Sequence, residues 1–454
     1  MTHILIATHH SNNRGDEAAL RGLITSLKEV IPDIHFTVLA STPKNTAEVF
    51  RKEQMTVLGW LPPIFSFKLV LKLSSLRKLN IFLNIPILIG QGIMELCNLS
   101  QLLLWAVLRR HGMETSLLIS NETREILRKI AEADIVLFSP AGPYFGDLYL
   151  YGVPTQVVQV LLAKILRKPV MICAPSMGPF HKTKWICKYT LNKVDVITLR
   201  EEVSRDMLAK LKLSHPLIRV TADCGLLQNP VSVEVVEKLI PEEIGQKRKY
   251  PLVGITVNPG VRKYIDYTRY KKIMAQIADY VISELNAKVL FIPQWYGLFS
   301  DIPLIKEIIS LMRFKDKPYV ISEDYLADEL HGILGEMDFL IATRYHSAVL
   351  GSAMNVPCVT IVYEHKARGF MRALELEEFT LDIKELSFED LVQKVDEIWA
   401  KRDQIKSVLP VQIKKLKERA QLNVTLAVEL LKYDKKSCPF QSFKAYYEAC
   451  NEDI

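Results

Sequence analysis

The closely spaced residues that hold most metal ions are missing from this 454-residue sequence. It contains no Cys-x-x-Cys pair and no Asp-x-Asp pair, and His9 and His10 are adjacent rather than at helix-face spacing. Because zinc ligands usually recur at short, regular spacings, the sequence predicts no metal site. The seven cysteines lie far apart along the chain. This spacing is typical of reduced cysteines in a cytoplasmic protein.

The common loops for binding nucleotides are also missing. The turn Asn-Arg-Gly-Asp-Glu at 13–17 follows an apolar strand, where α/β proteins often bind phosphate. It lacks the three spaced glycines of the dinucleotide fingerprint and the Gly-Lys-Ser/Thr of a Walker loop. The net charge of +7, from 58 basic and 51 acidic residues, is modest and forms no basic stripe. This composition argues against a nucleic-acid partner and fits an anionic substrate or a membrane surface.

The sequence lacks both a secretory signal and a long apolar run. Met1-Thr2-His3 leads directly into the apolar segment ILIAT, with no cleavage site after it. No uninterrupted apolar run reaches the roughly 18 residues that a membrane span requires. We therefore expect a cytoplasmic protein that contacts, at most, the inner face of the membrane.

An apolar insertion at about 56–118 interrupts the regular order of strands and helices. Its most apolar segments, 81–94 and 96–108, are separated by Glu95 and are each too short to span a bilayer. Basic residues flank them on both sides, which is typical of a peripheral membrane anchor. We therefore predict a membrane contact through 60–110. Packing of these helices within the domain, or against a second copy in a homo-oligomer, is the alternative.

The rest of the chain alternates short apolar strands with amphipathic helices, which is the pattern of a parallel α/β fold. At this length, two domains are expected. The first, at 1–230, opens with a strand–helix–strand unit. The second, at 250–410, restarts the alternation after a polar seam. The remaining residues, 411–454, are predicted to form a helical tail that packs back on the N-terminal domain.

Basic side chains follow two successive apolar strands of the second domain. Arg344 and His346 come directly after the strand 339–342, and Lys366 follows the strand 358–362. In open α/β sheets, ligands bind beyond the carboxyl ends of the strands, beside helix N-termini. The sequence therefore predicts a pocket for a small, strongly anionic group. A structural salt bridge beside a capped helix is the alternative, but the second cationic strand end favours a binding site.

Several motifs together resemble those of the polysaccharide pyruvyl transferase family. The resemblance covers nearly the whole chain except the insertion at 56–118 and the last residues. The motifs are Asn13 to Ala18, the Pro-rich loop at 139–147, Ser176-Met177-Gly178-Pro179-Phe180, Arg200-Glu201-x-x-Ser204, Ala222-Asp223, Arg344-Tyr345-His346-Ser347 and Tyr363-x-x-Lys366. Their common order and spacing make the resemblance more specific than any one of them.

The resemblance implies a fold and a reaction. The fold would be GT-B-like, with two Rossmann-like domains that face a cleft, the first on the acceptor side and the second on the donor side. The reaction would move the carboxyethylidene group of phosphoenolpyruvate to a sugar diol of a polysaccharide or a lipid-linked glycan. A pyruvate ketal would form and phosphate would be released. No cofactor beyond this donor substrate is expected.

The resemblance also implies roles for individual residues. Arg200 and Arg344 would hold the carboxylate and the phosphate of the donor, since guanidinium groups suit both anions. Phosphoenolpyruvate carries about three negative charges near neutral pH. His346 would donate a proton to C3 of the enol or to the departing phosphate, because its unperturbed pKa lies near 6.5. Lys366 would be a second phosphate contact.

The sugar hydroxyl needs a base, and two acidic residues in the first helix are the candidates. Asp16 or Glu17 would take this role, although Asp16 is also placed to cap the helix. The other residues expected to contact substrate lie in the same motifs: Asn13, Gly178, Tyr345 and Ser347.

Two other functions remain open from the sequence. A GT-B glycosyltransferase would place Arg344 and His346 on the diphosphate of a nucleotide-activated sugar, with Glu364 available for the ribose. A non-catalytic scaffold of a polysaccharide assembly complex would keep the fold without turnover. The presence of Arg200, Arg344 and His346 argues against a scaffold, which has no need for three such groups in a cleft.

Overall fold

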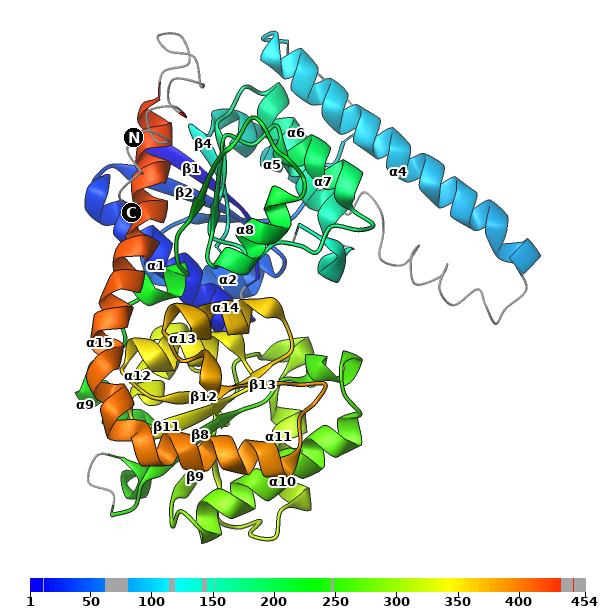
Figure 1. The fold of residues 1–454 in the computed structure, drawn as a ribbon. Coiled ribbons are helices and arrows are strands. Elements are labelled where there is room, and N and C mark those ends of the chain that lie inside the picture. The colour runs from blue at the N-terminus through cyan, green and yellow to red at the C-terminus, as the bar shows by residue number, and fades with distance from the viewer. Residues whose placement is uncertain are drawn as a thin grey trace.

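The computed structural model describes the chain except residues 11, 62–80, 114–118, 141–144, 151, 246–248, 434–443 and 445–454. Within this part, the chain forms two α/β domains, each built on a parallel sheet (Figure 1). The expected α/β class with two Rossmann-like domains is confirmed. The apolar runs of the sequence became the central strands because helices cover both faces of each sheet.

The N-terminal sheet has seven parallel strands among the described residues, in the order β3-β2-β1-β4-β5-β6-β7. They are β1 (Thr2–His9), β2 (Ile34–Ala40), β3 (Thr56–Gly59), β4 (Ile135–Phe138), β5 (Val170–Ile172), β6 (Val196–Leu199) and β7 (Leu217–Val220). The helices of this domain are α1 (Arg14–Val30), α2 (Pro43–Val49), α4 (Ile81–Arg110), α5 (Asn121–Glu132), α6 (Val153–Ile165), α7 (Lys184–Leu191) and α8 (Glu202–Ala209). One core lies between the sheet and α1, and another lies between the sheet and the layer of α4 to α7.

The C-terminal sheet has six parallel strands among the described residues, in the order β10-β9-β8-β11-β12-β13. They are β8 (Leu252–Thr256), β9 (Lys288–Phe291), β10 (Tyr319–Val320), β11 (Phe339–Ala342), β12 (Cys358–Val362) and β13 (Thr380–Asp382). Its helices are α9 (Val233–Leu239), α10 (Tyr267–Ser283), α11 (Ile302–Leu311), α12 (Ala327–Gly335), α13 (Tyr345–Ala353) and α14 (His365–Ala373). The strands β11 and β12 have the limits expected from their apolar runs.

A single helix, α15 (Phe388–Lys432), joins the two domains along one side (Figure 1). Its first part, up to Pro410, contributes Leu391 to the C-terminal core. Its second part contributes Leu416 to the same core and then Val424 and Leu430 to the N-terminal core. Pro410 lies inside the helix, and Figure 1 shows a bend between the two parts. A proline removes a helical hydrogen bond and causes such bends. The predicted tail at 411–454 is thus the second half of a longer helix, and its last residues lie largely outside the described part.

The apolar insertion differs from its sequence-based description in two ways. β3 pairs with β2, so the sheet continues to Gly59 and the inserted part begins later than residue 56. The segments on either side of Glu95 form one continuous helix, α4. Glu95 lies inside this helix and is buried. It does not interrupt the helix, because glutamate is a good helix former. Residues 62–80 of the predicted membrane contact lie outside the described part. Among the described residues, no helix combines the length and the apolar character needed to cross a bilayer.

Candidate functional site

The residues of interest lie at the carboxyl ends of neighbouring strands in both domains. Arg200 follows β6 and Asp223 follows β7, and these two strands pair directly. Arg344 and His346 follow β11, whose paired neighbour β12 is followed by Lys366. Carboxyl ends of parallel strands meet at one edge of a sheet, which is where ligands bind in open α/β folds. The two domains direct these edges toward each other.

The carboxylate of Asp223 is shared by residues from the two domains. Its Oδ2 accepts a hydrogen bond of 2.7 Å from Arg200 Nη1 and lies 3.5 Å from His346 Nε2. Its Oδ1 accepts from the Gly225 amide at 2.8 Å, which fixes the carboxylate. Arg200 and His346 therefore come together across the domain boundary.

Aromatic stacking and a serine complete the surroundings of Arg200. Its guanidinium lies over the Tyr345 ring, 4.4 Å from the centroid, and its Nε donates to Ser176 Oγ at 2.9 Å. The Tyr345 ring in turn meets the His346 ring edge to face at 4.9 Å. Guanidinium stacking on a buried ring restricts the orientation of the charge. Tyr345 thus holds Arg200 in place from the opposite domain.

Two opposing effects act on the titration of His346 and Asp223. Burial lowers the pKa of the His346 imidazole, and the nearby Asp223 carboxylate offsets only part of this effect. Burial would raise the pKa of Asp223, but His346 and Arg200 together hold it below its usual range. Asp223 therefore carries the negative charge, and His346 releases its proton more easily than an exposed histidine does.

Arg344 has a carboxylate partner of its own. Its Nε donates to Asp301 Oδ2 at 3.1 Å, and its Nη2 forms an ion pair with the other oxygen of the same group. The guanidinium also lies 5.5 Å from the centroid of the Trp295 ring. Asp301 accepts the amides of Gln294 and Trp295, which sets its position. The paired geometry gives Arg344 a fixed direction within a buried environment.

Asp16 is buried close to four charged groups of the site. Burial raises its pKa to about 7, and the positive charges of Lys366, Arg200 and Arg344 oppose this rise. The negative charge of Asp223 contributes to it. A carboxyl group that titrates near neutral pH in a cleft is a candidate for proton transfer.

The glycine before Asp16 explains how the first helix comes so close. A Cβ on Gly15 would lie 2.0 Å from His346 Nδ1, a distance that a side chain cannot adopt. Asn13 begins the helix, with its Oδ1 accepting from the Gly15 amide at 3.0 Å. The turn at residues 13–16 thus lays the start of α1 directly against His346. The Asn13 side chain therefore caps the N-terminus of α1.

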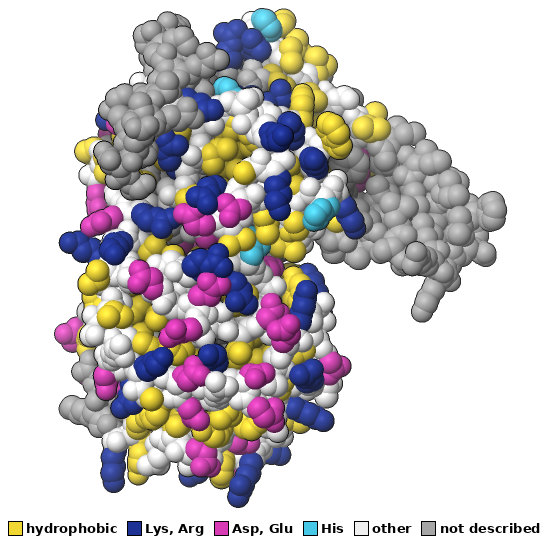
Figure 2. Space-filling model, viewed as in Figure 1, with side chains coloured by type: hydrophobic (Ala, Val, Ile, Leu, Met, Phe, Trp, Pro, Cys, Tyr) yellow, Lys and Arg dark blue, Asp and Glu magenta, His cyan; other side chains and the backbone are white. Residues whose placement is uncertain are grey.

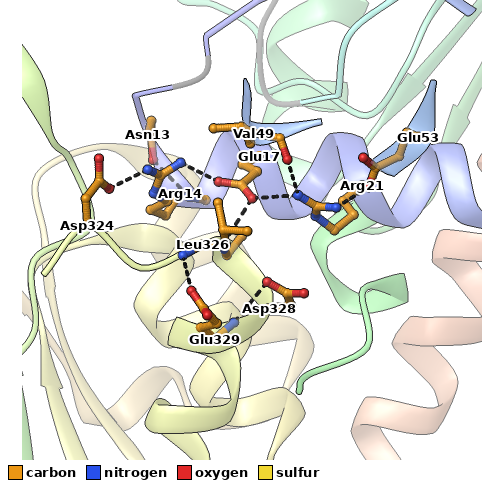
Figure 3. Close-up of polar contacts among 12 residues, drawn as sticks. Asn13, Arg14, Glu17, Arg21, Val49, Glu53, Asp324, Leu326, Asp328 and Glu329 are labelled. Atoms are coloured by element: carbon orange, nitrogen blue, oxygen red, sulfur yellow. Dashed lines mark hydrogen bonds and ion pairs between the residues drawn. The ribbon is translucent and has the colours of Figure 1, made fainter. Parts of the chain in front are cut away.

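Glu17, next to Asp16, faces a different set of partners (Figure 3). Its carboxylate accepts from Arg14 Nη1 at 2.6 Å, from Arg21 Nη2 at 3.0 Å and from the Ala327 amide at 3.2 Å. Arg14 also pairs with Asp324 of the C-terminal domain. Both Arg14 and Glu17 are fully buried. Of the two candidate bases, Asp16 lies in the field of the site cations, while Glu17 belongs to this inter-domain contact.

A small pocket adjoins Lys366. Its walls come from both domains: Phe145, Gly146, Leu148, Ser176, Gly178, Glu364, His365 and Lys366. Gly178 has a φ of +88°, and its backbone would collide with a Cβ on Gly146. Two glycines here allow the two loops to touch.

Lys366 and Ser347 complete the set expected from the sequence. Lys366 Nζ pairs with Glu364 at 2.8 Å and lies 5.9 Å from the Tyr345 ring centroid. Ser347 is fully buried on α13, and its Oγ has no hydrogen-bond partner among the described residues. Among the same residues, no group of three His, Cys, Asp or Glu side chains is arranged to hold a metal ion.

Some residues of the site were not predicted as such. Asp223 was recognised only as part of a motif, although a carboxylate after a strand could have been a signal. Ser176 was likewise recognised only as part of a motif, and Asp301 gave no signal, because its partner Arg344 is distant in sequence. His365 lines the pocket, with its Nε2 3.3 Å from Ser204 Oγ and 3.6 Å from Glu201 Oε1.

Two comparisons of the sequence with known proteins give matches over most of the chain. The family model described as polysaccharide pyruvyl transferase matches residues 13–365. The amylovoran biosynthesis protein AmsJ of Erwinia amylovora is 25% identical over 403 residues, which is 87% of this chain and 91% of that protein.

Solved structures resemble the whole chain at low sequence identity. A glycosyltransferase from Rickettsia africae has a TM-score of 0.56 at 15% identity, covering 95% of this chain and 99% of its own. Anabaena HepE, in complex with UDP and glucose, has a TM-score of 0.55 at 11% identity, covering 96% and 100%. These similarities confirm the GT-B-like fold.

The contact of Arg14 with Glu17 and Asp324 (Figure 3) predicts that substitutions of Arg14 and of Asp324 lower the stability by different amounts. Arg14→Ala should lower the free energy of unfolding by about 3 kcal/mol, because Glu17 stays buried with less compensating charge. Asp324→Ala, the matched control, should cost about 1 kcal/mol or less, because the Asp324 side chain is 51% exposed. Urea denaturation measures both. Equal losses would contradict this account of the contact.

The raised pKa of Asp16 predicts that removing its carboxylate makes the protein more stable at alkaline pH. Its pKa is raised from 3.8 to about 7, so the folded protein binds this proton more tightly than the unfolded chain. The resulting stabilisation is complete below the unfolded pKa and is lost as the pH rises through about 7. Asp16→Asn should therefore raise the free energy of unfolding at pH 8 by about 1–4 kcal/mol, and the gain should vanish near pH 4.

Urea denaturation at both pH values tests this expectation. The matched control is Asp403→Asn, which changes an exposed carboxylate on α15 and should leave stability unchanged. A less stable Asp16→Asn protein at pH 8 would show that the ionised carboxylate is favoured in the fold.

Proposed function

Since the chain belongs to the polysaccharide pyruvyl transferase family, we propose that it transfers the carboxyethylidene group of phosphoenolpyruvate to a sugar diol. The acceptor would be a sugar of a polysaccharide or of a lipid-linked glycan, and the products would be a pyruvate ketal and free phosphate. The relative AmsJ is a biosynthesis protein for amylovoran. This relationship supports an acceptor in polysaccharide biosynthesis.

The observation that carries this proposal is the meeting of buried basic side chains from both domains. Arg200 from the first domain and His346 from the second share Asp223, and Lys366 lies over the Tyr345 ring that also supports Arg200. Guanidinium groups in a dry cleft stabilise carboxylates and phosphates strongly. Phosphoenolpyruvate is small and carries about three negative charges, which suits a site where several basic side chains meet.

Two proton transfers are needed, and two residues have suitable surroundings. His346 would donate a proton to C3 of the enol or to the departing phosphate. The charge of a bound trianion would favour the imidazolium form, which burial disfavours in the free protein. Asp16 would accept the proton of the sugar hydroxyl, because its pKa of about 7 suits a base at neutral pH.

The bonds that change follow from this assignment. Protonation at C3 makes C2 electrophilic, and the first sugar hydroxyl adds to C2 as it loses its proton to the base. The bond between C2 and the phosphate oxygen then breaks, and the phosphate leaves. The second hydroxyl adds to the same carbon, closes the ketal and passes its proton to the departed phosphate, which becomes the hydrogen phosphate ion. Arg344, fixed by Asp301, would balance the negative charge of the donor throughout.

Incubation with phosphoenolpyruvate and a panel of free and lipid-linked glycans tests the function. We expect release of inorganic phosphate, together with a mass increase of one carboxyethylidene group on an acceptor. Release of UDP from a nucleotide-activated sugar, with no phosphate from phosphoenolpyruvate, would instead indicate a glycosyltransferase. Absence of binding heat with either donor would indicate a scaffold.

His346→Ala should reduce turnover about 100-fold or more, since it removes the proton donor, while the circular dichroism spectrum stays unchanged. The matched control is His35→Ala. His35 lies at the start of β2, on the sheet edge opposite the site, and bonds to Thr56. Activity of His346→Ala close to that of the unmodified protein would remove this histidine from the mechanism.

The pH dependence of kcat/KM tests the role of Asp16. A base must be ionised to act, so kcat/KM should rise about tenfold per pH unit below a pKa of about 7. In Asp16→Asn this acidic limb should disappear, and the rate should be lower at every pH. An unchanged limb in the variant would assign the limb to another group.

A further inference from the structure

The short helix α7 exposes large apolar side chains to solvent. The Trp185 side chain is 83% exposed, Tyr189 is 57% exposed and Ile186 is 42% exposed. The other four of the five tryptophans are buried or half-buried. Large apolar groups gathered on one exposed face usually mark an interaction surface.

Basic residues flank this apolar group in the sequence, and the segment that carries them contains no acidic residue. The segment 181–193 contains His181, Lys182, Lys184, Lys188 and Lys193, and it contains no Asp or Glu. On the face that Figure 2 displays, most acidic side chains lie over the C-terminal domain. Tryptophan and tyrosine favour the boundary between lipid and water, and lysines favour anionic headgroups.

The surface continues from α7 toward α4. α7 packs on α6, α6 packs on α4, and the three helices lie in one layer over the N-terminal sheet (Figure 1). The described part of α4 exposes Leu104 and Val107 and ends with exposed Arg109 and Arg110. The same combination of apolar and basic residues therefore occurs on two helices of one layer.

The start of α7 is joined directly to the pocket of the site. The Asp147 carboxylate accepts the amides of His181, Lys182 and Thr183 at 2.6, 3.0 and 2.9 Å. The neighbouring residues Gly146 and Leu148 line the pocket. A surface bound to α7 would thus lie beside the pocket mouth.

We propose that α7 docks on an anionic membrane surface, with Trp185, Ile186 and Tyr189 entering the headgroup region and the lysines contacting acidic lipids. The helix α7 lies outside the segment 60–110, for which the sequence predicts a membrane contact. It does not depend on the proposed reaction. It would bring a lipid-linked molecule in the same bilayer close to the pocket mouth.

A second copy of the chain is the competing occupant, and the charges disfavour it. In a twofold interface the same patch is present on both sides, so the lysines of one α7 would face the lysines of the other. Facing like charges with no acidic partner in the segment oppose association. Anionic lipids supply the missing negative charge.

Sedimentation with vesicles tests the proposal on the full chain. We expect binding to vesicles with about one third phosphatidylglycerol and little binding to phosphatidylcholine alone. Lys184→Glu with Lys188→Glu should weaken binding at least about 25-fold, since each lysine near an anionic surface contributes roughly fivefold. Trp185→Ser with Tyr189→Ser should weaken it about tenfold or more.

Matched double substitutions on α15 separate this effect from changes in overall charge and apolar content. Lys414→Glu with Lys415→Glu, and Val408→Ser with Val411→Ser, alter exposed residues far from α7 and should bind vesicles like the unmodified protein. Unchanged circular dichroism spectra show that every variant is folded.

Tryptophan fluorescence gives an independent reading of the same contact. Emission should shift to shorter wavelength with anionic vesicles, and this shift should be lost in Trp185→Phe. The proposal is overturned if the unmodified protein stays in the supernatant, or if the α7 variants bind as well as the α15 controls. A concentration-dependent dimer that the α7 variants abolish, without vesicle binding, would assign the surface to a second copy.

Discussion

The carboxylate of Asp223 is the interaction on which the candidate site depends. It follows the last strand of the N-terminal sheet, bonds Arg200 of its own domain and lies against His346 of the other domain. A buried negative charge of this kind is stable only when cations and amides surround it. The same charge keeps Arg200 oriented and partly offsets the effect of burial on His346. The position of the two domains and the electrostatics of the cleft are therefore linked through one side chain.

Asp16 and Glu17 are consecutive in the sequence, but helix geometry directs their side chains to different surroundings. Asp16 and Glu17 both lie in the first turn of α1 and are both buried. A step of one residue turns the side chain by about 100°, so one carboxylate faces the site cations and the other faces Arg14, Arg21 and α12. Glu17 is compensated by two guanidinium groups. Asp16 keeps a pKa near 7 because burial outweighs the more distant charges.

The connection between the domains combines one long element with several short contacts. The α15 helix contributes to the cores of both domains, and Asn423 on it bonds Thr221 and Ala222 just before Asp223. The loop after β9 pairs with Asn13, where Arg14 and Tyr296 bond to backbone oxygens across the domains. These contacts hold the two domains together. The residues of the site therefore do not have to supply all of the contact between the domains and can serve in binding or catalysis. The layer of α4, α6 and α7, in which α4 and α7 expose apolar and basic side chains, covers the face of the N-terminal sheet opposite to α1.

The sequence alone determined the strands, the two-domain order and the cationic strand ends, because apolar runs and their periodicity depend on neighbours in the chain. The limits of β4, β11 and β12 agree with their apolar runs, and Arg344, His346 and Lys366 lie at the predicted strand ends. The helix α4 continues through Glu95, where the polarity pattern predicts a division, because glutamate is a good helix former. Only the tertiary structure gave Arg344 to Asp301, Arg200 to Asp223 and Arg14 to Asp324. Those pairings join residues 43, 23 and 310 positions apart. Packing at the domain boundary decided which charges meet, because burial and distance set the strength of each interaction.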